Sequence, residues 1–422
     1  MTGFRDLRSN HDFTVLWIGQ TVSELGSALS VFVFPLITYA VTGSTMLAAV
    51  AGALDLLGTA IAVLPGGLLA DRVHRRTVMR TASASGAVLY GSLAVAGVLG
   101  ALTVPHLFAV AVLSGMANGV FAPAEMSAVR TVVPTEQLPT ALSQQQARQH
   151  VANLLGGPLG GLLYAVTRWA PFLVDAVSFA VSWVLLGRLR ADLSAPRREG
   201  PQRRPLQDVG EGIRFILAWP YFRATAAYGA LANLLVNAMF FVAILRMVQD
   251  GVSPAVIGLV STAAGLGGVL GALAAPWIIE RMPTGALVVT AAWVFVPLAV
   301  PMALWNQPAV VAVAIFVGLL LNPAGNAASG SYRIAHTPSR LQGRAQSAQQ
   351  FLAMSVIWLA PLLGGALLTS IGGSAAIAVI GSLVALTALI PTLTRSVRSV
   401  PRPAVWQAEL APRQDEGSLV AA

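Results

Sequence analysis

Long apolar stretches recur along the chain, and each is bounded by glycine, proline or charged residues. A helix that crosses the hydrocarbon core of a bilayer needs about 20 consecutive, mostly apolar residues. Twelve stretches approach or exceed this length, at residues 13–40, 46–70, 78–100, 105–125, 146–167, 170–190, 223–248, 252–279, 285–305, 308–330, 345–370 and 372–394. The pattern therefore predicts an all-α membrane protein with twelve transmembrane helices.

The composition narrows the functional classes. Of 422 residues, 56% are hydrophobic and only 10% are charged, whereas a soluble domain carries roughly 25% charged residues. Too few charges are present to cover a soluble globule, which argues against a soluble enzyme or a nucleic-acid-binding domain despite the net charge of +9. The chain has no cysteine, its five histidines are scattered, and it lacks a GxxxxGK[ST] segment, so we expect no metal, nucleotide or other cofactor.

One segment interrupts the apolar pattern. Residues 191–222 are rich in proline, arginine and acids, and they divide the chain into six helices within 1–190 and six within 223–394. We expect this segment to be a cytoplasmic linker between two six-helix bundles. Residues 395–422 carry arginines among prolines and acids, and we expect a disordered cytoplasmic tail there.

The arginines indicate how the chain is oriented. All 26 basic residues are arginine, and with the N-terminus inside, only Arg168 and Arg246 fall outside the inner loops, the linker and the termini. Cytoplasmic loops of membrane proteins carry an excess of basic residues. The distribution predicts a multi-pass protein of the bacterial inner membrane with both termini in the cytoplasm.

A polar repeat relates the two halves. PTEQLPTALSQQQ at 134–146 parallels PSRLQGRAQSAQQ at 338–350, and the glycine pair at 160–161 parallels the pair at 364–365. Structural repeats of this kind are typical of secondary transporters, in which the substrate site lies between the repeats. The repeat predicts pseudo-symmetric bundles and a transport function, and it argues against an enzyme.

The most distinctive local motif is GGLLADRVHRR, from Gly66 to Arg76 between the second and third helices. It places a single acid, Asp71, among Arg72, Arg75 and Arg76. A basic loop that served only to orient the chain would need neither the acid nor the glycine pair. We interpret the motif as functional.

Its Gly67–Arg76 portion resembles the loop signature of the major facilitator superfamily, except that His74 replaces a usual glycine. FAPAEMSAVRTVVP at 121–134, GPLGG at 157–161 and PFLVDAVSF at 171–179 resemble the drug-exporter branch with macrolide-efflux and enterobactin-exporter-like proteins. The resemblance implies that Asp71 docks against the eleventh helix near Arg344 and holds a cytoplasmic gate shut. It also implies that Gly157, Pro158, Gly160 and Gly161 form part of the antiporter motif of the fifth helix, although Gln144 and Asn153 replace two further glycines of that motif. Simple helix packing is the alternative interpretation of these glycines.

One family feature is missing. Met116 and Asn118 stand where the fourth helix of drug antiporters usually carries an arginine and a glutamine. Another group must then carry the proton, or the protein is not coupled to protons. Intramembrane acids are costly and usually face a cavity or a partner.

The candidates for a proton or substrate role are Glu24, Asp55 and Asp175. Glu24 is either such a group or a neutral acid bonded to a hydroxyl, and for Asp175 a structural hydrogen bond is the stronger interpretation. Glu125 lies near the inner interface, where Arg130 or Arg148 could pair with it.

Two asparagines offer a polar contact for a substrate. Asn233 and Asn237 are four residues apart on the seventh helix and share one face. They either contact the substrate or bond to another helix. Scattered aromatic and methionine side chains could line an adaptable apolar pocket.

These features lead to one functional hypothesis and two alternatives. We expect a monomeric secondary transporter that exports a small lipophilic drug or secondary metabolite by alternating access, coupled to protons and embedded in the lipid bilayer. The alternatives are a facilitator-fold importer or uniporter and, more remotely, a membrane sensor or enzyme that transports nothing.

Overall fold

The computed structural model describes residues 7, 10–134, 137–194, 205–338, 341–406 and 408, and most of them are helical. Within this part of the chain, ten helical segments are long and apolar enough to cross a membrane. The other two expected spans are present as helices that begin in a polar stretch, at residues 138–150 and 342–350. The architecture therefore matches twelve spans, and the two polar ones are the spans related by the sequence repeat.

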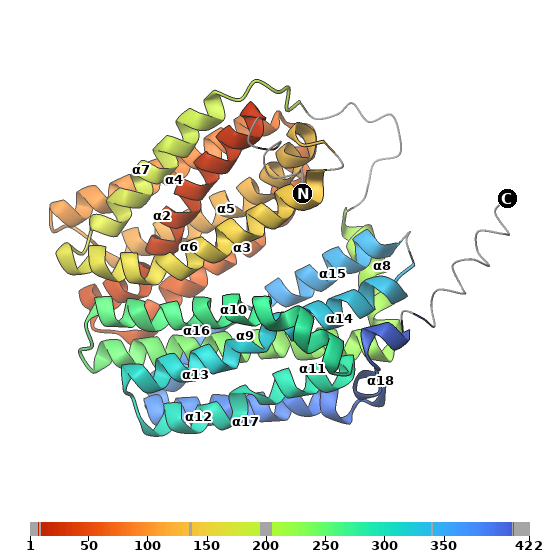
Figure 1. The fold of residues 1–422 in the computed structure, drawn as a ribbon. Coiled ribbons are helices and arrows are strands. Elements are labelled where there is room, and N and C mark those ends of the chain that lie inside the picture. The colour runs from red at the N-terminus through yellow and green to blue at the C-terminus, as the bar shows by residue number, and fades with distance from the viewer. Residues whose placement is uncertain are drawn as a thin grey trace. The chain divides into compact units, whose positions relative to one another are not determined.

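The first six spans are continuous helices. They are α2 (His11–Thr42), α3 (Thr45–Arg72), α4 (Arg75–Val98), α5 (Val104–Val132), α6 (Leu138–Val166) and α7 (Ala170–Gly187). The helix α5 extends beyond the expected apolar limit and stops just before Pro134, because the residue that precedes a proline disfavours the helical conformation. Figure 1 shows these helices side by side in red to yellow.

The last six spans include three broken helices. The elements are α9 (Pro220–Gln249), α10 (Pro254–Arg281), α11 (Thr284–Trp293), α12 (Phe295–Leu304), α13 (Pro308–Leu320), α14 (Asn322–His336), α15 (Gln342–Ser355), α16 (Leu359–Ile371) and α17 (Gly373–Leu393). The breaks between α11 and α12, α13 and α14, and α15 and α16 each precede a proline: Pro297, Pro323 and Pro361. A proline cannot donate the hydrogen bond to the carbonyl four residues earlier, and its ring clashes with that carbonyl.

The central linker contains a short helix, α8 (Pro205–Ala218). Ile216 of α8 is fully buried, and Gly212 lies so close to the Arg344 carbonyl of α15 that a larger residue would clash. The linker therefore contributes a packed element to the second half.

The expectation of a disordered tail from residue 395 is wrong for its first part. A short helix, α18 (Arg395–Arg398), is followed by packed chain in which Val397, Val400 and Trp406 are buried. The amides of Thr284 and Gly285 donate to the carbonyls of Pro401 and Val400, at 3.2 and 3.0 Å. The first amides of a helix have no partner within it, so this segment satisfies the start of α11. The tail beyond residue 408 lies outside the described residues.

The chain forms two compact units whose division does not follow the linker. Unit 1 comprises Met1–Gly200, Ile244–Gly265 and Pro361–Ser370, and unit 2 comprises Pro201–Ala243, Leu266–Ala360 and Ile371–Ala422. Parts of α9, α10 and α16 thus belong with the first six spans.

Each unit has an aromatic core. In unit 1, the ring centroids of Phe34 and Phe172 lie 5.3 Å apart, and those of Tyr90 and Phe179 lie 5.7 Å apart. In unit 2, Tyr332 contacts Tyr221 and the tail residue Trp406, with centroids 4.7 and 5.5 Å apart. These contacts tie the tail segment to α14 and α9.

Candidate functional site

Three charged side chains meet inside unit 1, and each comes from a different helix. Arg148 of α6 donates from Nε and Nη2 to the two carboxylate oxygens of Glu24 on α2, at 2.8 and 2.7 Å. Its Nη2 also donates to Oε1 of Glu125 on α5, at 2.9 Å. We call these three residues the charge cluster.

The cluster lies well within its helices. Glu24 lies about 20 Å from the start of α2, Arg148 about 15 Å from the start of α6, and Glu125 about 10 Å from the end of α5, at 1.5 Å per residue. The side chains of Arg148 and Glu125 are 4% and 9% exposed, whereas that of Glu24 is 26% exposed. Glu24 is therefore the member that water or a ligand can reach.

The charges of the cluster do not balance. Two carboxylates and one guanidinium carry a net charge of −1 when all are ionised, and the charged groups that act on Glu125 are Arg148 and Glu24. Like charges that share a poorly hydrated site disfavour full ionisation. A proton on one carboxyl would make the cluster neutral.

Sequence reasoning found the acids but missed the connection. We assigned Arg148 to an inner loop, whereas it lies in α6 and is buried. Of the two arginines considered as partners of Glu125, Arg130 and Arg148, the structure pairs Arg148 with it. Arg148 also pairs with Glu24. The sequence could have indicated this pairing, because Arg148 lies within the fifth span, where a buried arginine needs an acidic partner.

Asp55 and Asp175 accept hydrogen bonds from serine hydroxyls, whereas the acids of the charge cluster pair with an arginine. Asp55 of α3 is half-buried and accepts a hydrogen bond from Ser114 of α5 at 3.4 Å. Asp175 of α7 is fully buried and accepts from Ser178 at 3.1 Å, against the face of α2 that carries Gly26 and Ser30. Among the described side chains no base pairs with either acid.

Asn233 and Asn237 bond to each other along α9. The Asn237 amide donates to the backbone and side-chain oxygens of Asn233, both at 2.8 Å, and Asn237 is exposed. The helix α14 has the same arrangement, which the sequence analysis missed: exposed Asn326 donates to Asn322 at 2.7 Å. Both pairs lie in unit 2 and present amides that a substrate could contact.

The structure describes the glycines and the arginines of the Gly66–Arg76 motif. Gly66 packs against the Gly119 carbonyl of α5, whereas Gly67 has open space around it. Arg75 donates to the Ala70 carbonyl and to Thr131, at 3.3 and 3.0 Å. The side chain of Asp71 lies outside the described residues, so its expected docking stays a prediction.

The other arginines of the predicted gate have identified positions. Arg76 donates to the Ala191 carbonyl at 2.8 Å, and Arg72 is exposed at the end of α3. Arg344 pairs with Glu211 of α8 in unit 2. Both of these side chains are nearly half exposed, and water screens such a pair, so the pair itself stabilises the fold little.

The glycines of the fifth-helix motif allow two close helix contacts in unit 1. Gly160, with its neighbour Gly156, lies against Leu29, Phe32 and Ala28 of α2. Gly157 and Gly161 lie against the backbone of α10 at Gly258 and Pro254, and Pro158 is within the continuous helix. The helix α6 therefore packs tightly on α2 and α10 at once.

Metal binding has no geometric support in the described part of the chain. No group of three or more histidine, aspartate or glutamate side chains there could hold an ion.

Comparisons with known proteins agree with this architecture. A family model described as Major Facilitator Superfamily matches residues 16–245. The chain is 27% identical over 364 residues to "Multidrug efflux pump Tap" of Mycolicibacterium fortuitum, covering 82% of this chain and 87% of that protein. It is 26% identical over 275 residues to "Enterobactin exporter EntS" of Shigella boydii serotype 4 (strain Sb227), covering 63% of this chain and 64% of that protein.

Solved structures share the fold at low sequence identity. The nucleoside transporter NupG superposes with a TM-score of 0.70 at 12% identity, covering 90% of this chain and 98% of that one. A bacterial homologue of the iron transporter ferroportin, in an inward-facing state, superposes with a TM-score of 0.66 at 17% identity, covering 90% and 97%. These relatives and fold neighbours are transporters rather than enzymes.

Proposed function

The chain belongs to the Major Facilitator Superfamily, and we propose that it is a secondary transporter that exports a lipophilic compound in exchange for protons. The observation that carries the coupling proposal is the charge cluster of Glu24, Glu125 and Arg148. The export direction is supported by the relatives named as an efflux pump and as exporters. The lipophilic substrate class remains part of the proposal.

The cluster offers a direct link between a proton and helix packing. Glu24 is the more exposed of the two carboxyls, and in this proposal it takes up the proton. Protonation would remove the charge from the bidentate pair, which is the strong form of an arginine–carboxylate contact. Arg148 would then remain paired with Glu125, and the contact between α2 and α6 would weaken.

The weakened contact lies next to a close approach of the two helices. Gly156 of α6 faces Ala28 of α2, which is one helical turn from Glu24, and Gly160 faces Leu29. Small residues let helices pack closely without interlocking large side chains. Loss of the ion pair would therefore loosen α6, which also packs against α10, a helix of the last six spans, through Gly157 and Gly161.

We also propose the orientation, with both termini in the cytoplasm. It rests on the concentration of arginine in the inner loops. The contact of Gly157 and Gly161 with the start of α10 then lies in the outer half of the membrane. In the same half, Gly365 of α16 lies against Ala49 of α3.

The proton gradient is sufficient for the work. One charge that crosses 100 mV yields about 2.3 kcal/mol, and one pH unit corresponds to about 1.36 kcal/mol. One proton driven by roughly 150 mV and half a pH unit supplies about 4 kcal/mol. This supports nearly a thousandfold gradient of a neutral compound at tenfold per 1.4 kcal/mol.

The test uses inverted vesicles, a fluorescent lipophilic compound and an imposed pH gradient. Wild-type protein should accumulate the compound when the vesicle interior is acidic, and E24Q should lose the response to the gradient. The matched control is E280Q, an exposed acid at the end of α10, which should behave as wild type. Accumulation by wild type that ignores the gradient would rule out proton coupling, and cells that gain the compound would favour an importer.

The proposed gate is tested separately. Asp71 is expected to pair near Arg344 when the cytoplasmic side is closed, so D71N should slow transport without abolishing compound binding. Unchanged transport in D71N would remove Asp71 from the gate and leave the coupling proposal intact.

A further inference from the structure

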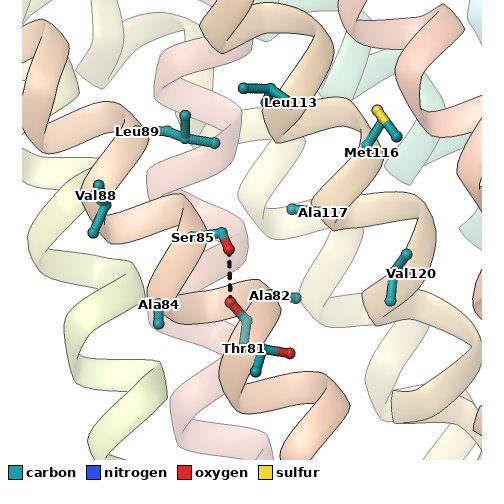
Figure 2. Close-up of a pocket in the computed structure, with 10 residues that line it drawn as sticks. All are labelled: Thr81, Ala82, Ala84, Ser85, Val88, Leu89, Leu113, Met116, Ala117 and Val120. Carbon is teal, nitrogen blue, oxygen red and sulfur yellow. Dashed lines mark hydrogen bonds between the residues drawn. The ribbon is translucent and has the colours of Figure 1, made fainter. Parts of the chain in front are cut away.

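A groove runs between α4 and α5 on unit 1, away from the contacts of the charge cluster. Its volume is about 580 Å³, and ten side chains line it: Thr81, Ala82, Ala84, Ser85, Val88, Leu89, Leu113, Met116, Ala117 and Val120. Figure 2 shows the side chains of α4 on one side and those of α5 on the other. Val88, Leu113 and Met116 are exposed, so the groove opens to the surroundings of the helices.

The groove offers no free polar group. Its two hydroxyls bond to their own helix: Ser85 donates to the Thr81 carbonyl and Thr81 donates to the Val78 carbonyl, both at 2.9 Å (Figure 2 shows the first). The remaining lining side chains are alanine, valine, leucine and methionine. Its chemistry therefore suits an alkyl chain rather than a polar ligand.

The groove begins within one membrane leaflet and extends past the middle of the membrane. Thr81 lies about 9 Å from the start of α4 and Val88 about 20 Å, at 1.5 Å per residue. Half of the hydrocarbon core is about 15 Å thick. The part of the groove near Thr81 thus lies at the depth of the acyl chain of a lipid whose headgroup is at the arginine-rich end of α4.

That end of the two helices is positively charged. Arg75 of α4 bridges to Thr131 of α5 at 3.0 Å, beyond the end of the groove. Arg130 is exposed next to Thr131, and Arg72 is exposed at the adjacent end of α3. Among the described residues, three acids lie at this end: Asp71 next to Arg72 in α3, Asp12, which accepts from the amides of Arg190 and Ala191, and Asp192, which contacts His74 at 3.5 Å. The arginines there outnumber the acids, because Arg76, Arg188 and Arg190 join Arg72, Arg75 and Arg130, so a phosphate would be attracted there.

We propose that this groove is a binding site for an anionic phospholipid, with an acyl chain between α4 and α5 and the phosphate at the exposed Arg130. Neither the family assignment nor the proposed transport reaction requires such a site. The site is distinct from the charge cluster, and it would make stability depend on the lipid composition of the membrane.

The test is native mass spectrometry of the full-length protein with equal amounts of phosphatidylglycerol and phosphatidylcholine that carry the same chains. Wild type should retain phosphatidylglycerol in preference. R130Q should lower this preference about fivefold, because an arginine near the surface contributes about that factor. A117L and A84L each place a larger side chain in the groove and should displace about two methylene groups of the acyl chain. We expect each variant to lower phosphatidylglycerol binding about tenfold.

The control is A180L, which adds the same bulk to an exposed position on α7 outside the groove and should bind lipid as wild type does. The proposal is overturned if wild type does not distinguish the two lipids or if A117L and A84L bind as A180L does. Glycerol phosphate, which has a headgroup but no chain, should fail to displace the lipid. Displacement by it at the concentration that suffices for a short-chain phosphatidylglycerol would contradict the role of the groove.

Discussion

Removal of Arg148 should destabilise the protein because it leaves a buried carboxylate without its partner. In R148Q the three donated bonds of 2.7 to 2.9 Å are lost, and Glu125, whose side chain is 9% exposed, pairs with no other basic side chain in the described part of the chain. Breaking a buried ion pair by removing one partner typically costs about 3–5 kcal/mol, most of which reflects the uncompensated charge. We expect the free energy of unfolding to fall by about 3 kcal/mol.

The double variant R148Q/E125Q separates this cause from simple loss of packing. It removes the unpaired buried charge, and Glu24 can be hydrated because its side chain is 26% exposed. We expect the double variant to recover about 2 kcal/mol relative to R148Q. Transport driven by a pH gradient should not return, since the bidentate contact with Glu24 is still absent.

The assay is unfolding of the purified protein in mixed detergent micelles free of phospholipid, so that the proposed lipid site is empty, with R130Q as the matched control. Arg130 is an exposed arginine at the end of α5, so its loss should change stability by less than about 0.5 kcal/mol. If R148Q is no less stable than R130Q, the cluster does not hold the three helices together. If the double variant is as unstable as R148Q, the unpaired carboxylate is not the cause.

Three further perturbations test individual contacts. G66A should destabilise by about 1–3 kcal/mol in the same unfolding assay because its methyl group meets the backbone of α5, whereas G67A, in open space, should be neutral or stabilising; equal losses would contradict this packing. W406A should destabilise by about 3 kcal/mol, since its side chain is 4% exposed and packs on Tyr332, and an unchanged unfolding curve would show that the tail segment is not docked. Hydrogen bonds from the Ser194 hydroxyl and amide lower the pKa of Asp192 below 3.8, so these bonds persist above that pH and are lost as the pH falls through the lowered pKa. Hydrogen exchange at the Ser194 amide, corrected for its intrinsic pH dependence, should be constant from pH 7 to 5 and rise at lower pH; a rise already at pH 6 would contradict this.

The spans could be predicted because they depend on local sequence. Apolar length determined ten of them directly, and the polar repeat located the two whose first halves are hydrophilic. The breaks in the second half follow from Pro297, Pro323 and Pro361, although proline alone does not determine them. Pro35 and Pro158 lie within continuous helices, where neighbouring contacts maintain the helix.

The site could be predicted only in part because its contacts join distant residues. Glu24 and Arg148 are 124 positions apart, and nothing in either local sequence specifies that α2 and α6 bring them together. The packed tail was missed for a similar reason. Trp406 follows a polar, proline-containing stretch, and its burial depends on the aromatic surface formed by Tyr332 and His336.

The position of the intramembrane arginine has a mechanical consequence. Met116 and Asn118 of α5 lack the charged group expected on the fourth helix, and Arg148 supplies a guanidinium from α6 instead, while α5 supplies the acid Glu125. The same helix α6 carries the glycines that face α2 and α10. A proton on Glu24 would therefore act directly on a helix that belongs to two close-packed interfaces. The proposed coupling then requires no chain of intermediate residues, because Glu24 of α2 bonds directly to Arg148 of α6 and lies one turn from Ala28, which Gly156 of α6 contacts.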